Sequence, residues 1–412
     1  MEFRNLTPFA VQNYKMLDKN DKEHHVVVMK AGYQLNRDAH GDVQAVVMDS
    51  DPVALSFQDV FAGEVNQSSE LQESDLAPFK PLCDVIITAT AHAPEGKPCA
   101  AFPVSVTLTR ADGEVLLNKT LTVAGAQHIE QQGWPRQWEL SEPAPFVALP
   151  INYEVAFGGE CRIERDDEAA AEVPAEHQLT PEQQNTHPQA PASPLAHTVF
   201  TANPIGMGYI EPWYARAKKV TSLPLPRITD PRHPYTQEQA MALIAGTADL
   251  NAPAYQPAGF GLIGRAWQPR LAKAGTYDET WLENRHPYLP ADFDFNYWNG
   301  APADQQITFP PLNLKITLHN LTPGGSLHFT LPDHLAFILL RLKNGAMVPQ
   351  KMWLDTLYID AEQQRVIVTW RYVLAADAPL RVMEARYEVH PEQWLEKIYP
   401  LQVDQSHAKE SE

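Results

Sequence analysis

The sequence has few cysteines, an excess of acidic over basic side chains, and no long hydrophobic run. Its three cysteines, Cys83, Cys99 and Cys161, form no C-x-x-C pair, so neither a disulfide framework nor a thiolate zinc site is indicated. The formal net charge of -19 repels phosphate backbones and anionic lipid headgroups. We therefore expect no nucleic-acid partner and no membrane partner, and a reducing cytosol suits the cysteines.

Targeting and membrane-spanning patterns are also missing. The N-terminal residues MEFRNLTPFAVQNYK carry charged and polar side chains where a signal peptide has a continuous apolar run. The longest apolar stretches, such as Leu335 to Leu340, fall far short of the roughly 20 residues that cross a bilayer. The expected location is cytoplasmic.

What the sequence does contain is a strand-and-turn rhythm in two regions. Asp112-Gly113 lies between two apolar runs and predicts a tight hairpin. Gln237 to Ala245, preceded by a Thr236 cap, is the one persuasive helix of the middle region. The expected strands are Val26 to Leu35, Val43 to Met48, Cys83 to His92, Pro103 to Arg110, Val115 to Val123, Tyr153 to Phe157, Leu312 to His319, Ser326 to Leu331, Leu335 to Leu342, Met352 to Asp360, Arg365 to Val373 and Leu380 to Val389.

These runs predict a mainly β protein with two β-sandwich-like domains joined by a linker, a coil-rich aromatic segment and few short helices. More than one domain is expected because a single core rarely grows far beyond about 250 residues. A short helix is expected from Pro391 to Ile398. The expected divisions are an N-terminal β-sandwich-like domain at 1–160, a flexible acidic and proline-rich linker or loop at 161–199, a coil-rich middle segment with a C-terminal β domain at 200–402, and a polar tail at 403–412.

One glycine pattern suggests nucleotide binding but lacks its context. Gly259 to Gly264 matches G-x-G-x-x-G, and Asp278 follows, as in dinucleotide sites. Such a loop needs a strand before it and a helix after it, whereas Pro253, Pro257 and Pro269 bracket this one. We expect no nucleotide and no other cofactor.

Other reactive patterns are equally incomplete. Asp292 and Asp294 have the spacing of an inverting glycosidase pair on a strand, but loop solvation is the simpler interpretation. His286 near these carboxylates, or the adjacent His24 and His25, lacks the geometry of a metal site. Nothing near Cys161 lowers its pKa, so all three cysteines are interpreted as packing residues. The sequence thus predicts no catalytic residue, no metal site and no enzyme.

The richest feature is an aromatic segment from Tyr277 to Trp298. Most of its rings are expected to close a core under a long loop. A subset, together with nearby aromatics and an arginine, is expected to form a protein-binding surface, because such side chains supply most interface hot spots. The candidate contact residues are Trp213, Tyr214, Phe260, Trp267, Arg270, Tyr277 and Trp281.

Several ordered motifs run along the chain: Pro257 to Arg270, Ala274 to Trp281, Leu289 to Asp294, Ala301 to Gln306, Asp84-Val-Ile, Ala93 to Lys97, Tyr153 to Gly159, Asn203 to Tyr209, Leu354 to Thr356 and Thr369 to Arg371. Together they resemble the adaptor or chaperone family encoded beside bacterial type VI secretion effectors. The likeness covers roughly residues 5–375. It implies a cytoplasmic protein that binds and stabilises a cognate toxin, often one with a PAAR or PAAR-like domain, and promotes loading onto the VgrG spike. It implies no catalytic residues.

Two other functions remain open. A β-sandwich with surface aromatics also suits a carbohydrate-binding or glycan-processing protein, because aromatic rings stack on sugars. A structural component of the secretion apparatus would carry the same motifs but would stay in the assembled particle.

Overall fold

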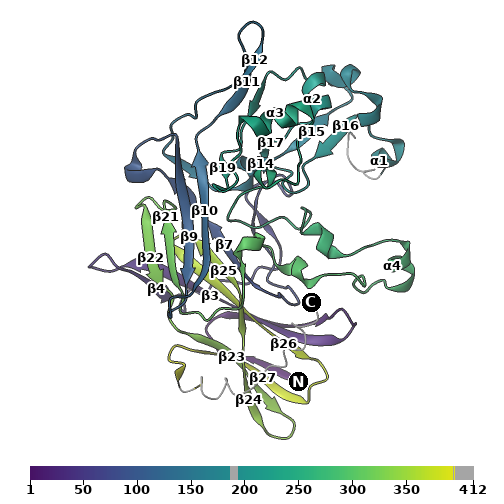
Figure 1. Cartoon of the computed structure of the whole chain (residues 1–412). Helices are drawn as coiled ribbons and strands as arrows, with labels where there is room; N and C mark the ends of the chain where they lie inside the picture. The colour runs from purple at the N-terminus through teal and green to yellow at the C-terminus, as the bar shows by residue number, and fades with distance from the viewer. Residues whose placement is uncertain (186–193, 393, 395–412) are drawn as a thin grey trace.

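The computed structural model describes residues 1–185, 194–392 and 394, and β-strands dominate them (Figure 1). The predicted mainly β class with few short helices is confirmed. The predicted helix from Pro391 to Ile398 lies mostly outside the described residues, and the predicted tail at 403–412 lies wholly outside them. No helix in the described part of the chain is long and apolar enough to span a membrane.

The largest sheet has seven strands, which come from early and late parts of the chain. Its order is β2 (Ala10–Leu17), β3 (Glu23–Arg37), β26 (Arg365–Ala375), β25 (Trp353–Asp360), β7 (Cys83–Thr88) and β20 (Gln306–Ile307), with β4 (Val43–Val47) beside β3. β25 pairs in parallel with β7 and antiparallel with β26, and β26 pairs with β3. The predicted arrangement as two β-sandwich-like domains is not confirmed: strands from both predicted domains share this sheet.

Two further sheets complete the main body. Both contribute to one hydrophobic core with the seven-stranded sheet. The predicted hairpin joins β9 (Ala101–Thr109) and β10 (Val115–Ala124), and Gly113 takes a positive φ of 95° in its turn. The five-stranded sheet has the order β19 (Ile228–Thr229), β10 (Val115–Ala124), β9 (Ala101–Thr109), β21 (Lys315–His319), β22 (Ser326–Thr330), and the four-stranded sheet β1 (Glu2–Asn5), β27 (Leu380–Glu388), β23 (Leu335–Leu342), β24 (Met347–Lys351).

A second core lies among short strands and helices in the middle of the chain, drawn in teal in Figure 1. Ile163, Ala169 and Val173, from the segment predicted to be a linker, are buried in it. The elements of this region are β11 (His128–Gln132), β12 (Gln137–Leu140), β14 (Phe157–Gly158), β15 (Glu160–Ile163), α1 (Pro181–Asn185), β16 (Ala196–Val199), β17 (Met207–Gly208), α2 (Pro212–Ala217), β18 (Ser222–Pro224) and α3 (Gln237–Ala245). The remaining strands are β5 (Val60–Phe61), β6 (Glu70–Gln72), β8 (Thr90–His92) and β13 (Ala148–Pro150).

Two local predictions have opposite outcomes. The predicted helix is α3, and Thr236 caps it in a reciprocal box with Gln239. The predicted strand from Tyr153 to Phe157 is wrong over most of its length, because residues 153–155 form a 3₁₀ turn. Buried Asn203 donates to the Tyr153 and Phe157 carbonyls at 2.8 and 3.0 Å, which satisfies backbone groups that a ladder would otherwise pair.

The central strands of the seven-stranded sheet, β3, β26, β25 and β7, are buried on both faces. Val366, Val368, Trp370 and Tyr372 alternate along β26, so they share one face, and all four lie in the main core. The intervening Arg371 points to the other face, where it is 4% exposed. That second face carries a row of charged and polar side chains, here called the ionic face: Lys30, Asp84, Asp355, Thr356, Thr369 and Arg371.

Ion pairs attach the covering loops to this ionic face. Arg371 bonds Asp355 at 2.6 Å and donates to the Ala77 carbonyl at 2.7 Å. Lys30 pairs with Asp75 at 2.7 Å, and both side chains are almost fully buried. Because Asp75 and Ala77 belong to the segment between β6 and β7, these bonds fix that segment against the sheet.

Additional bonds bring the middle of the chain to the same face. Lys80 pairs with Asp84 at 2.8 Å. The Asp84 carboxylate also accepts hydrogen bonds from the Gly300 and Ala301 backbone and from the Asn299 side chain, each at 3.1 Å. Asp84 thus connects β7 to residues 299–301, which lie just beyond the aromatic segment.

Replacing only Arg371 of the Arg371–Asp355 pair should destabilise the protein more than replacing both residues. Arg371→Met leaves the Asp355 carboxylate buried without its partner, so we expect the free energy of unfolding to fall by about 3 to 5 kcal/mol. The double variant Arg371→Met with Asp355→Leu should recover part of that loss. Denaturant unfolding of Arg371→Met, Asp355→Leu and the double variant checks this, and a double variant whose loss equals the sum of the two single losses would contradict it.

Candidate functional site

Residues 271–298, here called the arm, form a loop that leaves the body of the protein and carries α4 (Glu279–Asn284) near its tip (Figure 1). The Asp292 carboxylate accepts hydrogen bonds from Thr276, from its backbone N–H at 3.0 Å and its hydroxyl at 2.7 Å. The Asp294 N–H donates to the Lys273 carbonyl at 2.9 Å. These bonds join the outgoing and returning halves of the arm near its base.

The tip of the arm is held by its own side chains and by a neighbouring hairpin. Asp278 caps α4 by accepting a hydrogen bond from the Trp281 N–H at 2.8 Å. The Trp281 indole N–H donates to the Tyr288 carbonyl at 2.8 Å. Arg285 donates to both carboxylate oxygens of Asp21, in the turn between β2 and β3, at 2.9 and 3.0 Å. The arm therefore has a defined shape without a core of its own.

This arm exposes large apolar side chains. Tyr277 is 54% exposed and Leu282 is 59% exposed, and Tyr288 is also exposed. The Tyr277 ring packs edge to face against the ring of half-buried Trp281, and the two ring centroids lie 4.7 Å apart. Exposed apolar groups gathered on one short segment are typical of protein–protein contact sites.

Two of the sequence-predicted contact residues lie far from the arm in the second core. Trp213, in α2, is 2% exposed and stacks on the His177 ring at 5.4 Å. Tyr214 follows it in the same helix and packs half-buried against the same core. The structure does not bring this pair together with the arm aromatics.

Three others lie inside the body of the protein. Phe260 belongs to the main core, Trp267 is 6% exposed in a small cluster of its own, and Arg270 is buried in ion pairs. Of the seven predicted residues, Tyr277 and Trp281 alone meet on the arm. The binding role of all seven stays a prediction, but the buried side chains offer little surface in the free chain.

The glycine pattern at Gly259 to Gly264 forms a packed loop. Neither a strand nor a helix is assigned to residues 259–264. Its Phe260 carbonyl accepts hydrogen bonds from the Ile87 N–H at 3.1 Å and the Gln305 amide at 2.9 Å. The loop backbone therefore bonds to β7 and to Gln305.

The two spaced carboxylates have local structural partners. Hydrogen bonds from Thr276 hold the pKa of Asp292 below its usual value. Asp294 accepts a hydrogen bond from the Asn296 N–H at 2.8 Å and caps the 3₁₀ turn at Phe295–Trp298. Each carboxylate thus serves the local fold of the arm.

The histidine and cysteine candidates are likewise packed or dispersed. The His286 ring packs edge to face against the Trp281 ring, with the two ring centroids 5.2 Å apart. Burial raises the pKa of the Cys161 thiol to about 11, and it also raises that of Cys83. Within residues 1–185, 194–392 and 394, no three His, Cys, Asp or Glu side chains gather in a group that could hold a metal ion.

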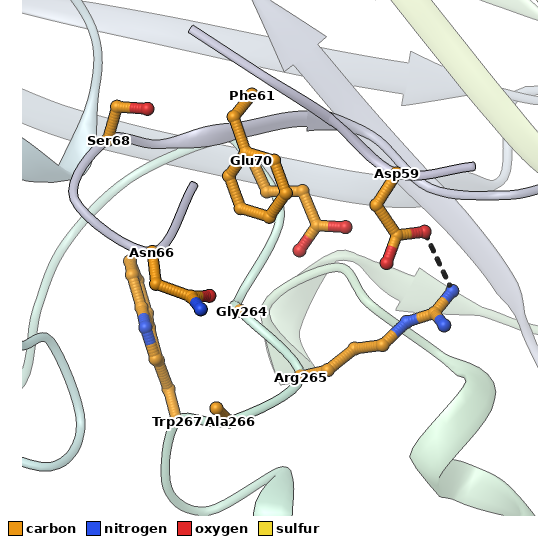
Figure 2. A pocket seen from close by; sticks show the side chains of 9 residues that line it. All are labelled: Asp59, Phe61, Asn66, Ser68, Glu70, Gly264, Arg265, Ala266 and Trp267. Carbon is orange, nitrogen blue, oxygen red and sulfur yellow. Dashed lines mark ion pairs between the residues drawn. The ribbon is translucent and has the colours of Figure 1, made fainter. Parts of the chain in front are cut away.

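A small pocket lies beside the ionic face, between the β5–β6 hairpin and the loop after the glycine pattern (Figure 2). Its volume is about 100 Å³. Glu70, Asn66 and Arg265 border it, and Trp267 forms part of its wall. The Arg265 guanidinium reaches Asp59 at 3.2 Å, the ion pair drawn in Figure 2.

Glu70 is the residue of this pocket that sequence reasoning missed. It is 6% exposed, and burial, followed by the negative charges of Glu73 and Asp59, raises its pKa to about 8. The sequence offers no local signal for it, because Glu70 is one acidic residue among several in a polar stretch. Arg265 and Trp267, which line the same pocket, lie almost 200 residues further along the chain.

Comparison with known proteins identifies one family. The model of DUF2169, described as an uncharacterized protein conserved in bacteria, matches residues 20–371. No curated protein and no solved structure matches the chain.

Glu70 should make stability depend on pH. Its folded pKa is raised, so the folded protein binds the proton more tightly than the unfolded chain, and stability falls as pH rises from about 4.5 toward 8. Glu70→Gln removes this loss. We expect its stability gain over the parent to grow by at least about 2 kcal/mol between about pH 5 and about pH 8.5.

Thermal or denaturant unfolding at both pH values measures this gain. The matched control is Glu64→Gln, an exposed carboxylate of the same hairpin, which should give the same small difference at both pH values. A pH-independent difference for Glu70→Gln would contradict the raised pKa.

Proposed function

We propose that this chain, which belongs to the DUF2169 family of bacterial proteins, is an adaptor or chaperone for a type VI secretion effector. In this role it binds and stabilises a cognate toxin with a PAAR or PAAR-like domain and promotes its loading onto the VgrG spike. The effector and VgrG are the proposed partners, and the proposed location is the cytoplasm. No chemical step is part of this role, so the protein is proposed not to be an enzyme.

The observation that carries this proposal is the exposed, shaped arm. Tyr277 and Leu282 expose more than half of their surface, while Asp278 and Arg285 hold the arm in one conformation. A binding surface that is ordered beforehand loses less conformational entropy on association. Exposed aromatic anchors on such a surface are the side chains that dominate binding free energy.

The sequence motifs support the same role in a different way. Asp84, Asp355 and Arg371 belong to motifs that resemble the adaptor family, and all three are buried in ion pairs. They shape the scaffold and do not reach the surface. These motifs therefore describe a rigid framework, while two others, Ala274 to Trp281 and Leu289 to Asp294, lie in the arm that offers apolar contact area.

Co-expression with the neighbouring effector and size-exclusion chromatography test the proposal. We expect the protein and the effector to elute as one complex. Tyr277→Ser combined with Leu282→Ser should weaken their affinity at least about tenfold, since each exposed anchor contributes on the order of 1 to 2 kcal/mol. The unfolding temperature should be unchanged, because both side chains already contact water in the free protein.

The matched control is Val115→Ser combined with Trp134→Ser, which removes two exposed apolar side chains outside the arm, one at the start of β10 and one in the turn between β11 and β12. This variant should bind the effector like the parent. Separate elution of parent and effector at micromolar concentration would contradict the adaptor role. Glycan binding without a protein partner would instead support the carbohydrate-binding alternative, and retention in the secreted particle would support a structural role.

A further inference from the structure

The pocket beside the ionic face has an unbalanced set of charges. Three carboxylates, those of Asp59, Glu70 and Glu73, share this region with two guanidinium groups. Arg265 bonds to Asp59 at 3.2 Å and to Glu73 at 3.3 Å. Arg270 bonds to Glu73 and to backbone carbonyls. Each guanidinium is thus paired with Asp59 or Glu73, and the buried Nη2 atom of Arg270 has no hydrogen-bond partner among the described residues. Three carboxylates against two guanidinium groups leave one negative charge over.

That remaining charge belongs to Glu70. Its side chain is more than nine-tenths buried, and its Oε1 atom has no hydrogen-bond partner among the described residues. Figure 2 shows its carboxylate pointing into the space bordered by Asn66, Gly264 and Arg265. A buried acceptor without a partner costs free energy, so this carboxylate is suited to receive a donor from outside the chain.

The walls of the pocket define which donor fits. In Figure 2 the Trp267 ring lies on one side with Asn66, and the Asp59–Arg265 pair lies on the other. An indole face attracts cations, and the side-chain oxygens of Asn66 and Ser68 can accept further N–H donors. The volume of about 100 Å³ is several times what one water molecule needs.

We propose that this pocket binds a small organic cation, a guanidinium or primary ammonium group, with the Glu70 carboxylate as its counter-ion and Trp267 as its wall. Such a group supplies both the missing positive charge and the missing N–H donor. The cation can belong to a free amine or to an arginine or lysine side chain of another protein. This binding does not depend on the effector role proposed above.

The ionisation of Glu70 links this binding to pH. Because its pKa is raised to about 8, the carboxyl is largely protonated at neutral pH when the pocket is free. The cation binds the carboxylate form and displaces this proton. Glu73, Asp59, Arg265 and Arg270 face the same carboxyl. Burial favours the protonated form of Glu73, but the charge and hydrogen bond of Arg270, with the other nearby cations, outweigh burial and hold the pKa of Glu73 below its usual value.

Isothermal titration calorimetry of the full chain with butylguanidinium and butylammonium tests the proposal, with butanol as the uncharged control. We expect saturable binding of a cation and none of butanol. Affinity should rise at least about fivefold from about pH 6.5 to about pH 8.5, with proton release seen in buffers of different ionisation enthalpy.

Two variants separate Glu70 from its surroundings. Glu70→Gln keeps the shape of the side chain and should lower the affinity at least about tenfold, while Glu64→Gln should bind like the parent. Equal binding by Glu70→Gln, or butanol binding as tightly as the cations, would overturn the proposal. Should Glu70→Gln fail to fold, the pH series on the parent decides, since an affinity that does not change with pH would also overturn it.

The source of the cation is distinguished with the same measurement. A short capped peptide with one arginine presents the group as a protein side chain, whereas butylguanidinium presents it alone. Tight binding of the peptide indicates a partner's side chain, and binding of the small cation alone indicates a free amine. Binding of neither contradicts a cation site.

Discussion

The ion pairs on the ionic face of the seven-stranded sheet are the constraint on which the rest of the structure depends. The central strands of this sheet are buried on both sides and can hold Lys30, Asp84 and Arg371 only if each charge has a partner. Asp75 and Lys80, from the segment between β6 and β7, pair with Lys30 and Asp84, and Asp355 of β25 pairs with Arg371. Arg371 also donates to the Ala77 carbonyl of that covering segment. These ion pairs and hydrogen bonds therefore fix the positions of the covering loops. The pocket and the base of the arm follow from these positions, because residues 70–80 and 299–301 lie next to them in the chain.

The strands could be predicted from the sequence wherever one face alternates with the other. Val366, Val368 and Trp370 show the pattern clearly, and the structure places them in the main core. The nature of the opposite face could not be predicted, because Thr369 and Arg371 look like solvent-facing residues in a local pattern. Their burial depends on segments distant in sequence. The Tyr153 strand was predicted wrongly for a related reason, since Asn203 supplies hydrogen bonds that no local pattern reveals.

The candidate site was predicted in part. The aromatic density of residues 277–298 correctly drew attention to the arm, but composition alone does not separate an exposed Tyr277 from a buried Phe293. Trp267 and Arg270 occur in the same motif and are both buried, one against aromatic rings and the other in ion pairs. Glu70 was missed because its unusual environment is assembled from two loops, one near residue 70 and the other near residue 265. A charged residue acquires such properties from tertiary neighbours, not from its place in the sequence.

The pairing of the late strands β25 and β26 with the early strands β7 and β3 has a consequence for how the protein is made. The sheet neighbour of Val28 in β26 is Arg371, so the central strands cannot close until residue 371 has left the ribosome. Before then, β3 and β7 present unpaired backbone edges, and edges of this kind associate readily with other chains. Contacts between such distant residues also slow folding. During synthesis these strand edges are thus exposed for an interval, although β26 and β25 pair with them in the folded protein.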